Sequence, residues 1–242
     1  MTPQDDGTHG LVRLVLFDMN ETLSDMAPLR SRFKEIGLPG HLAATWFAGV
    51  LRDGIALTAA GGWASFGDVA DDVLRGLLAG RRGWQGDPDR AVRAVLDAVN
   101  DLDVHPDVPD AIRGLHAAGL RLATLTNGSR TTGERLLARA GVLPHFEALL
   151  DVDEPRAWKP ARAAYHWAAE RLEVEPARIL LVAVHPWDID GAARAGMRTA
   201  WVNRGGGPYP RTMTAPDHTV SDLRELVTGP AAGGTTTGSR GK

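Results

Sequence analysis

The apolar positions of the chain follow one pattern near its start and another later. Residues 11–17, LVRLVLF, form a short run rich in Leu, Val and Phe that ends at a polar residue. Such a run is typical of a strand buried on both faces of a parallel sheet. The next eighty or so residues have apolar positions at helical spacing and no convincing strand. This predicts a helical insertion after the first strand, with helices within 27–37, 41–61, 66–80 and 87–102.

Helices and strands alternate from residue 106 onward. We expect strands within 120–129, 146–152, 178–184 and 198–203, and helices over 109–118, 131–140 and 161–172 and from about residue 188. This alternation is typical of right-handed βαβ units around a parallel sheet. The predicted fold class is α/β, a Rossmann-like parallel-sheet core with a helical cap inserted after the first strand. We expect the core over 11–26 and 104–228, the cap over 27–103 and a disordered Gly/Thr-rich tail over 229–242.

Composition narrows the classes of partner. The net charge of −3 gives no electrostatic basis for binding nucleic acid or an anionic membrane. The absence of cysteine excludes disulfides, thiolate nucleophiles and cysteine-ligated metals. No apolar run approaches the roughly 20 residues of a transmembrane helix, and no cationic region precedes the first apolar run. We therefore expect a cytoplasmic protein with a small-molecule substrate.

Polar residues follow several of the predicted strands. Because the carboxyl ends of parallel strands meet at one edge of a sheet, residues that follow them come together there. Each of them alone has a structural explanation, as a turn residue or a helix cap. Their occurrence together at matching edges favours a functional site. The candidates are Asp18, Thr126, Asn127, His185 and Asp188, with Lys159 on a WKP turn in a chain that otherwise mostly uses arginine.

Four motifs in order, FDMNETL, LTNGS, WKPA and VAVHPWDIDGA, resemble those of the haloacid dehalogenase superfamily and, within it, the 2-haloacid dehalogenase group. The resemblance covers about residues 11–224. It implies that Asp18 is a nucleophile that forms an ester with the substrate. A carboxylate suits this role because it is ionised at neutral pH without a base. The resemblance also implies that Lys159 neutralises and orients Asp18, and that Asp188 activates the water that cleaves the ester.

The resemblance implies a substrate-binding set as well. Thr22, Thr126 and Asn127 would hold the polar end of the substrate through hydroxyl, amide and backbone donors. Tyr165 lies where the dehalogenases carry a tyrosine, and packing within a helix is its alternative explanation. A homodimer is a further implication of the family.

Two residues separate this chain from the phosphatases of the same superfamily. Those enzymes carry an acid where this chain has Asn20, and that acid donates a proton to a departing alkoxide. An amide cannot do this, and a halide does not need it. The phosphatases also bind Mg²⁺ through an acid at the position of Val184, whose side chain has no oxygen ligand. We therefore expect no metal and no cofactor, and a halide-like leaving group.

Two other positions depart from the dehalogenases. Phe47 falls where those enzymes place an arginine that contacts halide and substrate, and Arg52, over a turn further on, is the alternative cation. His185 replaces an asparagine, so it could share in water activation or orient Asp188, or serve a structural hydrogen bond. The leading prediction is a metal-independent hydrolase most like a 2-haloacid dehalogenase. The alternatives are a phosphatase-like hydrolase and a non-catalytic binding protein with the same fold.

Overall fold

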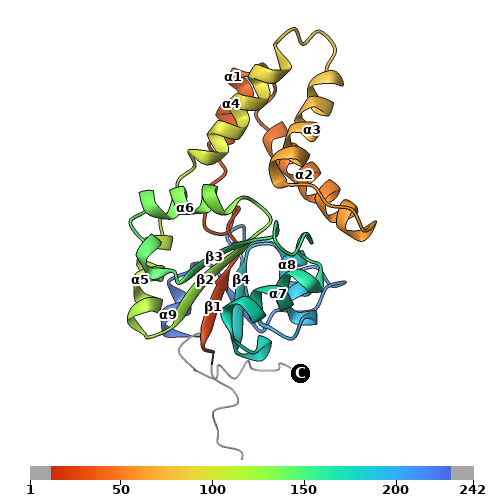
Figure 1. Cartoon of the computed structure of the whole chain (residues 1–242). Coiled ribbons are helices and arrows are strands. Elements are labelled where there is room, and N and C mark those ends of the chain that lie inside the picture. Colours follow the sequence, from red (N-terminus) through yellow and green to blue (C-terminus); the bar gives the residue numbers. More distant parts are fainter. Residues whose placement is uncertain (1–11, 230–242) are drawn as a thin grey trace, which may run out of the picture.

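The computed structural model describes residues 12–229. Its centre is a six-stranded sheet in which every pair of neighbouring strands is parallel (Figure 1). The strand order is β3-β2-β1-β4-β5-β6, so β1 lies between β2 and β4. The strands are β1 (Leu14–Phe17), β2 (Arg121–Thr126), β3 (Ala148–Asp151), β4 (Ile179–Ala183), β5 (Arg198–Val202) and β6 (His218–Val220).

The central strands are continuous apolar runs. Every residue of β1, LVLF, and of β4, ILLVA, is buried. This is the pattern expected where helices cover both faces of a parallel sheet. Leu14 aligns with Arg121 of β2 on one side and with Ile179 of β4 on the other. This register brings the carboxyl ends of the three strands to one edge.

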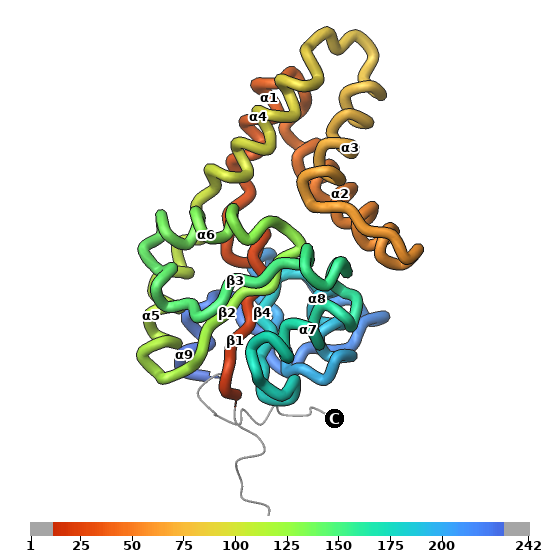
Figure 2. Tube along the Cα trace, in the orientation of Figure 1, coloured from red at the N-terminus to blue at the C-terminus, as the bar shows by residue number. Residues whose placement is uncertain are grey.

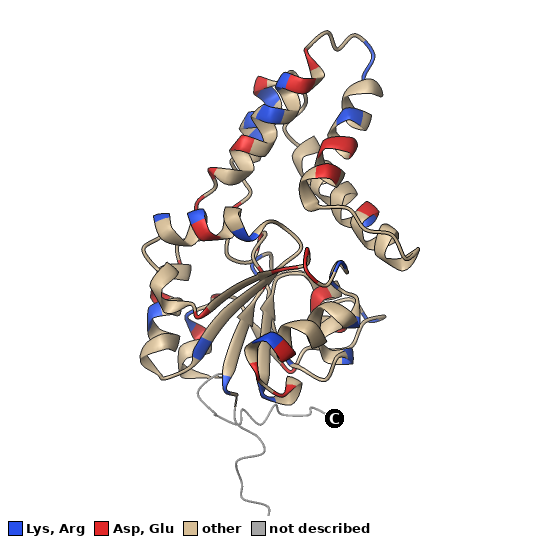
Figure 3. Ribbon diagram, viewed as in Figure 1, with Lys and Arg blue, Asp and Glu red and all other residues tan. Residues whose placement is uncertain are grey.

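Helices cover the sheet on both sides. Figure 2 shows α5 and α9 on one side and α7 and α8 on the other, as expected when right-handed crossovers run outward from β1 in both directions. Figure 3 shows charged residues mostly on helices and loops and few on the strands. These core helices are α5 (Val108–Ala117), α6 (Arg130–Arg139), α7 (Arg162–Leu172), α8 (Pro186–Arg194) and the short α9 (Glu225–Thr228). Short 3-10 turns, Leu143–His145 and Pro176–Arg178, precede β3 and β4.

Four further helices stand over the carboxyl edge of the sheet (Figure 1). The chain leaves the core after β1 and returns before α5, and Ser24 and Val104 pair in an antiparallel bridge where the two connections meet. The helix α4 begins as its sequence predicts, because the Asp87 side chain accepts hydrogen bonds from the backbone nitrogens of Asp89 and Arg90. The four helices are α1 (Leu29–Glu35), α2 (Leu42–Ala59), α3 (Phe66–Ala79) and α4 (Pro88–Asn100), and we call them the cap.

The predicted α/β fold class is confirmed, with two elements missed and one start misplaced. The short β6 and α9 were not predicted. The helix α8 begins at Pro186 rather than near Asp188, because proline suits the first turn of a helix. The exact domain boundaries stay predictions, and the predicted tail lies outside the described residues beyond Gly229. No helix of the described chain is both long and apolar enough to cross a membrane.

Candidate active site

Asp18 follows β1 directly and is almost completely buried. Its backbone nitrogen donates to the carbonyl of Val182 in β4, at 3.0 Å, which extends the strand by one residue. One carboxylate oxygen, Oδ1, accepts a hydrogen bond from Nζ of Lys159 at 2.9 Å. The other, Oδ2, accepts one from Oγ1 of Thr22 at 2.6 Å. Both oxygens of Asp18 are therefore oriented by donors.

Lys159 joins Asp18 to a second carboxylate. Its Nζ lies 2.6 Å from Oδ2 of Asp188, and both side chains are fully buried. The Lys159 backbone is held in turn by Asn127, whose Oδ1 accepts from the Lys159 nitrogen at 2.8 Å and whose Nδ2 donates to the Lys159 carbonyl at 3.1 Å. The end of β2 thus fixes the lysine that bridges the two aspartates.

Asp188 lies in the first turn of α8, and α8 packs against α7. Oδ1 of Asp188 accepts a hydrogen bond from the hydroxyl of Tyr165 at 2.6 Å, and Tyr165 is fully buried. Gly191 makes this approach possible, because a Cβ there would lie 2.7 Å from the Tyr165 hydroxyl oxygen. Asp188 is therefore bound on one oxygen by a cation and on the other by a phenol.

The two aspartates have opposite pKa shifts. Burial acts to raise the pKa of Asp18, but the positive charge of Lys159, the nearby His185 and the hydrogen bond from Thr22 outweigh it and hold that pKa below its usual value. Burial raises the pKa of Asp188, the charge of Asp18 adds to the effect, and Lys159 opposes it. Carboxyl pairs separated in this way are suited to different roles in acid–base and nucleophilic chemistry.

The bridging groups keep their protons. Burial acts to lower the pKa of Lys159, but Asp18 and Asp188 raise it above its usual value, so the ammonium stays charged. Burial, together with the charge of Asp188, raises the pKa of Tyr165 well above its usual value. Tyr165 is therefore a permanent hydrogen-bond donor to Asp188.

His185 lies beside Asp18 and caps the start of α8 without a side-chain hydrogen bond to the helix. Its ring stacks on Trp187, with centroids 4.9 Å apart, and lies 6.2 Å from the ring of Phe47. Nε2 of His185 is 3.1 Å from the carbonyl oxygen of Asn20 and 3.8 Å from Oδ2 of Asp18. His185 thus makes a hydrogen bond to the loop after β1, and a structural hydrogen bond was one of the roles considered for this histidine.

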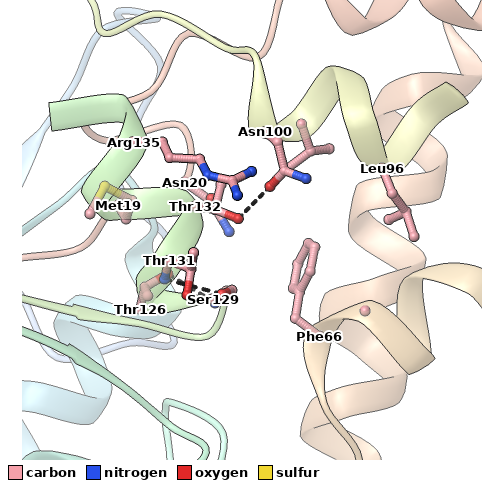
Figure 4. Close-up of a pocket in the computed structure, with 14 residues that line it drawn as sticks. Met19, Asn20, Phe66, Leu96, Asn100, Thr126, Ser129, Thr131, Thr132 and Arg135 are labelled. Carbon is pink, nitrogen blue, oxygen red and sulfur yellow. Dashed lines mark hydrogen bonds between the residues drawn. The ribbon is translucent and has the colours of Figure 1, made fainter. Parts of the chain in front are cut away.

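A pocket of about 320 Å³ lies between the cap and the core (Figure 4). Met19 and Asn20 of the loop after β1 line it, as does Thr126 at the end of β2. Phe66 and Leu96 of the cap face them across the gap in Figure 4. The other lining residues are Gly67, Val99, Asn100, Gly128, Ser129, Thr131, Thr132, Gly133 and Arg135. We call this space the cap–core pocket.

The residues expected to bind substrate fall into two groups in the structure, those that line the cap–core pocket and those whose polar atoms have partners within the protein. Asn20 and Thr126 line the cap–core pocket. The hydrogen-bonding groups of three others face inward instead, to partners within the protein: Thr22 to Asp18, Asn127 to Lys159 and Tyr165 to Asp188. The sequence places these three near the substrate, but it does not show that their polar atoms already have buried partners.

The two candidates for the cap arginine position lie elsewhere. Phe47 is buried and lines a second cavity, of about 550 Å³, beside His105, Val184 and Arg204. Arg52 points to solvent, with a side chain 73% exposed, and forms a salt bridge with Asp53. Neither lines the cap–core pocket.

Several residues at the site were not singled out by the sequence. Trp158 precedes Lys159 and packs into the cap, and Trp187 stacks on His185. Their positions in the WKP and HPWD motifs were the available signal. Arg135 lines the cap–core pocket and has no such signal, since it is one of three arginines on the helix α6.

The donor set around Asp18 differs from a magnesium site. Val184 contributes only its backbone nitrogen, which donates to Oγ1 of Thr22 at 3.0 Å. The charge between the two aspartates comes from the Lys159 ammonium. Within residues 12–229, no three histidine, aspartate or glutamate side chains are grouped so that they could hold a metal ion.

Comparison with known proteins agrees with this fold. A model of the haloacid dehalogenase-like hydrolases matches residues 12–196. The (S)-2-haloacid dehalogenase of Pseudomonas sp. (strain YL) is 31% identical over 220 residues, 89% of this chain and 93% of that protein. The structure of L-2-haloacid dehalogenase from Xanthobacter autotrophicus matches with a TM-score of 0.81 at 26% identity, over 90% of this chain and 98% of that one. A structure of that enzyme with chloropropionic acid covalently bound has a TM-score of 0.79 at the same identity and coverage.

The α/β fold with its parallel sheet is thus shared with a known class of enzymes. The chain belongs to the haloacid dehalogenase-like hydrolases.

Proposed function

We propose that the protein hydrolyses the carbon–halogen bond of a 2-haloacid through a covalent ester at Asp18. The observation that carries the proposal is the buried Lys159 ammonium, which lies 2.9 Å from Asp18 and 2.6 Å from Asp188. The names of the relatives support it, since they are 2-haloacid dehalogenases and one of them has been solved with chloropropionic acid covalently bound.

In the first step a carboxylate oxygen of Asp18 attacks C2 of the acid, and the halide leaves with the bonding electron pair. The low pKa of Asp18 keeps this carboxylate ionised. The hydrogen bonds from Lys159 and Thr22 hold it in one orientation, which favours a defined line of attack. No acid is needed, because a halide leaves as a stable anion.

In the second step Asp188 takes a proton from water as that water attacks Cγ of the ester. The bond between Cγ and the ester oxygen then breaks, and the proton passes from Asp188 to the departing oxygen of the 2-hydroxy acid. Asp18 loses the second proton of the water to solvent and is restored as a carboxylate. The raised pKa of Asp188 makes it a better proton acceptor than an ordinary aspartate.

The surrounding residues have two kinds of role: some bind the substrate, and others position the charged side chains of the site. We assign Asn20, Thr126 and neighbouring backbone groups to the substrate, because they line the cap–core pocket. Thr22, Asn127 and Tyr165 position the three charged groups. His185 holds the nucleophile loop through the Asn20 carbonyl.

Trapping the ester tests this mechanism. Asp188→Asn should form the ester and fail to hydrolyse it, so incubation with 2-bromopropionate should add the mass of a 1-carboxyethyl group at Asp18. Asp18→Asn should lose turnover by several orders of magnitude, because an amide is a poor nucleophile. Halide release and intact-protein mass spectrometry measure the two effects.

Asp190→Asn is the matched control, since Asp190 lies two residues further along α8 and pairs with Arg194 rather than with the site. It should keep wild-type halide release. Full activity of Asp18→Asn, with deamidation excluded by mass, would contradict the covalent mechanism. So would an Asp188→Asn protein that stays inactive without any adduct.

Chelation distinguishes this proposal from a phosphatase-like activity. Halide release should be unchanged by EDTA, because Asn20 and Val184 supply no carboxylate to a metal and Lys159 already neutralises the aspartates. Release of phosphate from a phosphate ester that stops with EDTA and returns with Mg²⁺ would favour the alternative.

The sequence also supports a cytoplasmic location and a homodimer, and we propose both. Fractionation of cells that express the chain tests the first. Light scattering coupled to size-exclusion chromatography tests the second.

A further inference from the structure

The cap–core pocket combines an apolar wall with a single charge. Phe66 and Leu96 of the cap and Met19 of the nucleophile loop supply apolar surface. Among the described residues that line the pocket, Arg135 is the only one with a charge, and no acid accompanies it. Figure 4 shows its side chain extending from α6 on the side where Asn20 and Thr132 lie. Such a pocket favours an anion with an apolar body.

Arg135 has no partner of its own within residues 12–229. Two other arginines, in contrast, already have acidic partners. Arg52 pairs with Asp53 at the surface, and Arg204 in the second cavity binds both oxygens of Asp107. An unpaired guanidinium beside a neutral pocket can form charge-assisted hydrogen bonds with a carboxylate without first breaking an internal ion pair.

We propose that Arg135 binds the carboxylate of the substrate, and that this substrate is a 2-haloacid whose alkyl chain lies against Phe66 and Leu96. This inference rests on the proposed function and deepens it. The family resemblance implies an arginine on the cap, but Phe47 stands at that position and Arg52 pairs with Asp53 at the surface. The cation would instead come from the core helix α6.

The size of the pocket supports a substrate longer than three carbons. Its volume of about 320 Å³ falls within the roughly 300–1,000 Å³ range of sites that hold drug-sized ligands, which are larger than a three-carbon acid. Each methylene buried against the apolar wall should raise kcat/KM by about fourfold, since such a group contributes about 0.8 kcal/mol. The gain should continue until the alkyl chain fills the pocket.

Halide release from 2-bromopropionate, 2-bromobutanoate and 2-bromohexanoate tests both parts. We expect kcat/KM to rise along the series in the wild type, and the rise to be reduced in Leu96→Ala. Arg135→Gln should raise KM about tenfold for every acid, with kcat changed less, as expected for loss of one charge-assisted hydrogen bond. Arg135→Lys should lie between the two because it keeps the charge but not the planar donors. The control is Arg130→Gln, because Arg130 is exposed like Arg135 and lies on the same helix but does not line the pocket.

Calorimetric binding of hexanoate separates this inference from the mechanism. Hexanoate has no leaving group, so its binding does not depend on the chemistry at Asp18. It should bind Arg135→Gln about tenfold more weakly than wild type, whether or not halide is released. Equal affinity for wild type and Arg135→Gln, or a KM that does not change, would overturn the role of Arg135. A preference for 2-bromopropionate over the longer acids would overturn the chain-length part. Absence of halide release from every acid would instead reject the proposed function.

Discussion

Asp18 and Asp188 have the same side chain and lie close together, but their pKa values are shifted in opposite directions. Both are buried and both contact Nζ of Lys159. Asp18 also has a hydroxyl donor and a nearby imidazole, and its pKa is lowered. Asp188 has a phenol donor and the negative charge of Asp18 near it, and its pKa is raised. The difference favours a nucleophile at the first position and a base at the second.

The hydrogen bond from Tyr165 to Asp188 leads to a prediction about pH. This bond stabilises the ionised form of Asp188 and so lowers its pKa. Removing it in Tyr165→Phe should raise that pKa further. Since the base must be ionised to accept a proton, activity should then be lost at a higher pH as the solution is acidified. We also expect kcat near neutral pH to fall by about tenfold.

The acid limb of the kcat profile for halide release measures this effect in wild type and Tyr165→Phe. A residue that only filled space would lower kcat equally at every pH. An unchanged acid limb would therefore contradict the positioning role of Tyr165.

At the scale of elements, the contact between α2 and the turn before α7 joins the cap to the segment that carries Lys159. Trp158 directly precedes Lys159. Its indole nitrogen donates to the carbonyl of Ala64, its backbone nitrogen donates to Thr58, and its ring stacks on Phe66. Any shift of α2 against this ring is therefore transmitted to the residue next to Lys159.

Gly54 of α2 tests this connection. A Cβ at Gly54 would lie 2.4 Å from the Trp158 ring, so Gly54→Ala must displace the ring or the helix. We expect kcat/KM to fall by at least about tenfold, because small misplacements of catalytic groups are costly. Steady-state halide release measures the effect.

Gly76→Ala in α3 is the matched control. Nothing lies within 4 Å of a Cβ at that position, so alanine should raise the free energy of unfolding by about 0.5–1 kcal/mol and leave activity unchanged. A Gly54→Ala protein as active as Gly76→Ala would contradict the coupling of cap and lysine.

At the scale of the whole molecule, Asp107 holds together segments that are far apart in the sequence. Its carboxylate binds the guanidinium of Arg204 at 3.0 and 3.1 Å and accepts from the backbone nitrogen of Leu223 at 2.8 Å. Arg204 also donates to the carbonyl of Thr22. The start of α5, the loop after β5, the chain before α9 and the loop after β1 thus meet around one buried carboxylate.

Asp107→Asn should therefore destabilise the protein. The substitution leaves Arg204 without a charged partner in a mostly buried site, and we expect a loss of about 2 kcal/mol in the free energy of unfolding. Urea denaturation followed by circular dichroism measures it. Glu35→Gln, which breaks the exposed Arg32–Glu35 pair, should change stability by less than about 0.5 kcal/mol. Equal effects of the two substitutions would show that the Asp107 contact has no special role.

The sequence by itself determined the architecture and the charged centre. The uninterrupted run of β1 identified a strand buried on both faces, and the helical periodicity that follows identified the cap. The ends of the predicted strands, together with the resemblance of four ordered motifs to a known family, singled out Asp18, Lys159 and Asp188. These features are readable because spacing between neighbours along the chain sets which faces are apolar. The three-residue β6 was missed, because so short a strand carries too few positions to show a period and forms by pairing with β5.

Only the tertiary structure decided what each polar side chain touches. Tyr165 could have packed within its helix or faced substrate, and the close approach at Gly191 brings it to Asp188 instead. Asn127 binds the backbone of Lys159 because the end of β2 meets the WKP turn. Arg52 and Arg135 look alike in the sequence, yet one pairs with Asp53 at the surface and the other lines the cap–core pocket. Such contacts join residues distant in the sequence, so they depend on strand register and helix packing, which no local pattern of residues specifies.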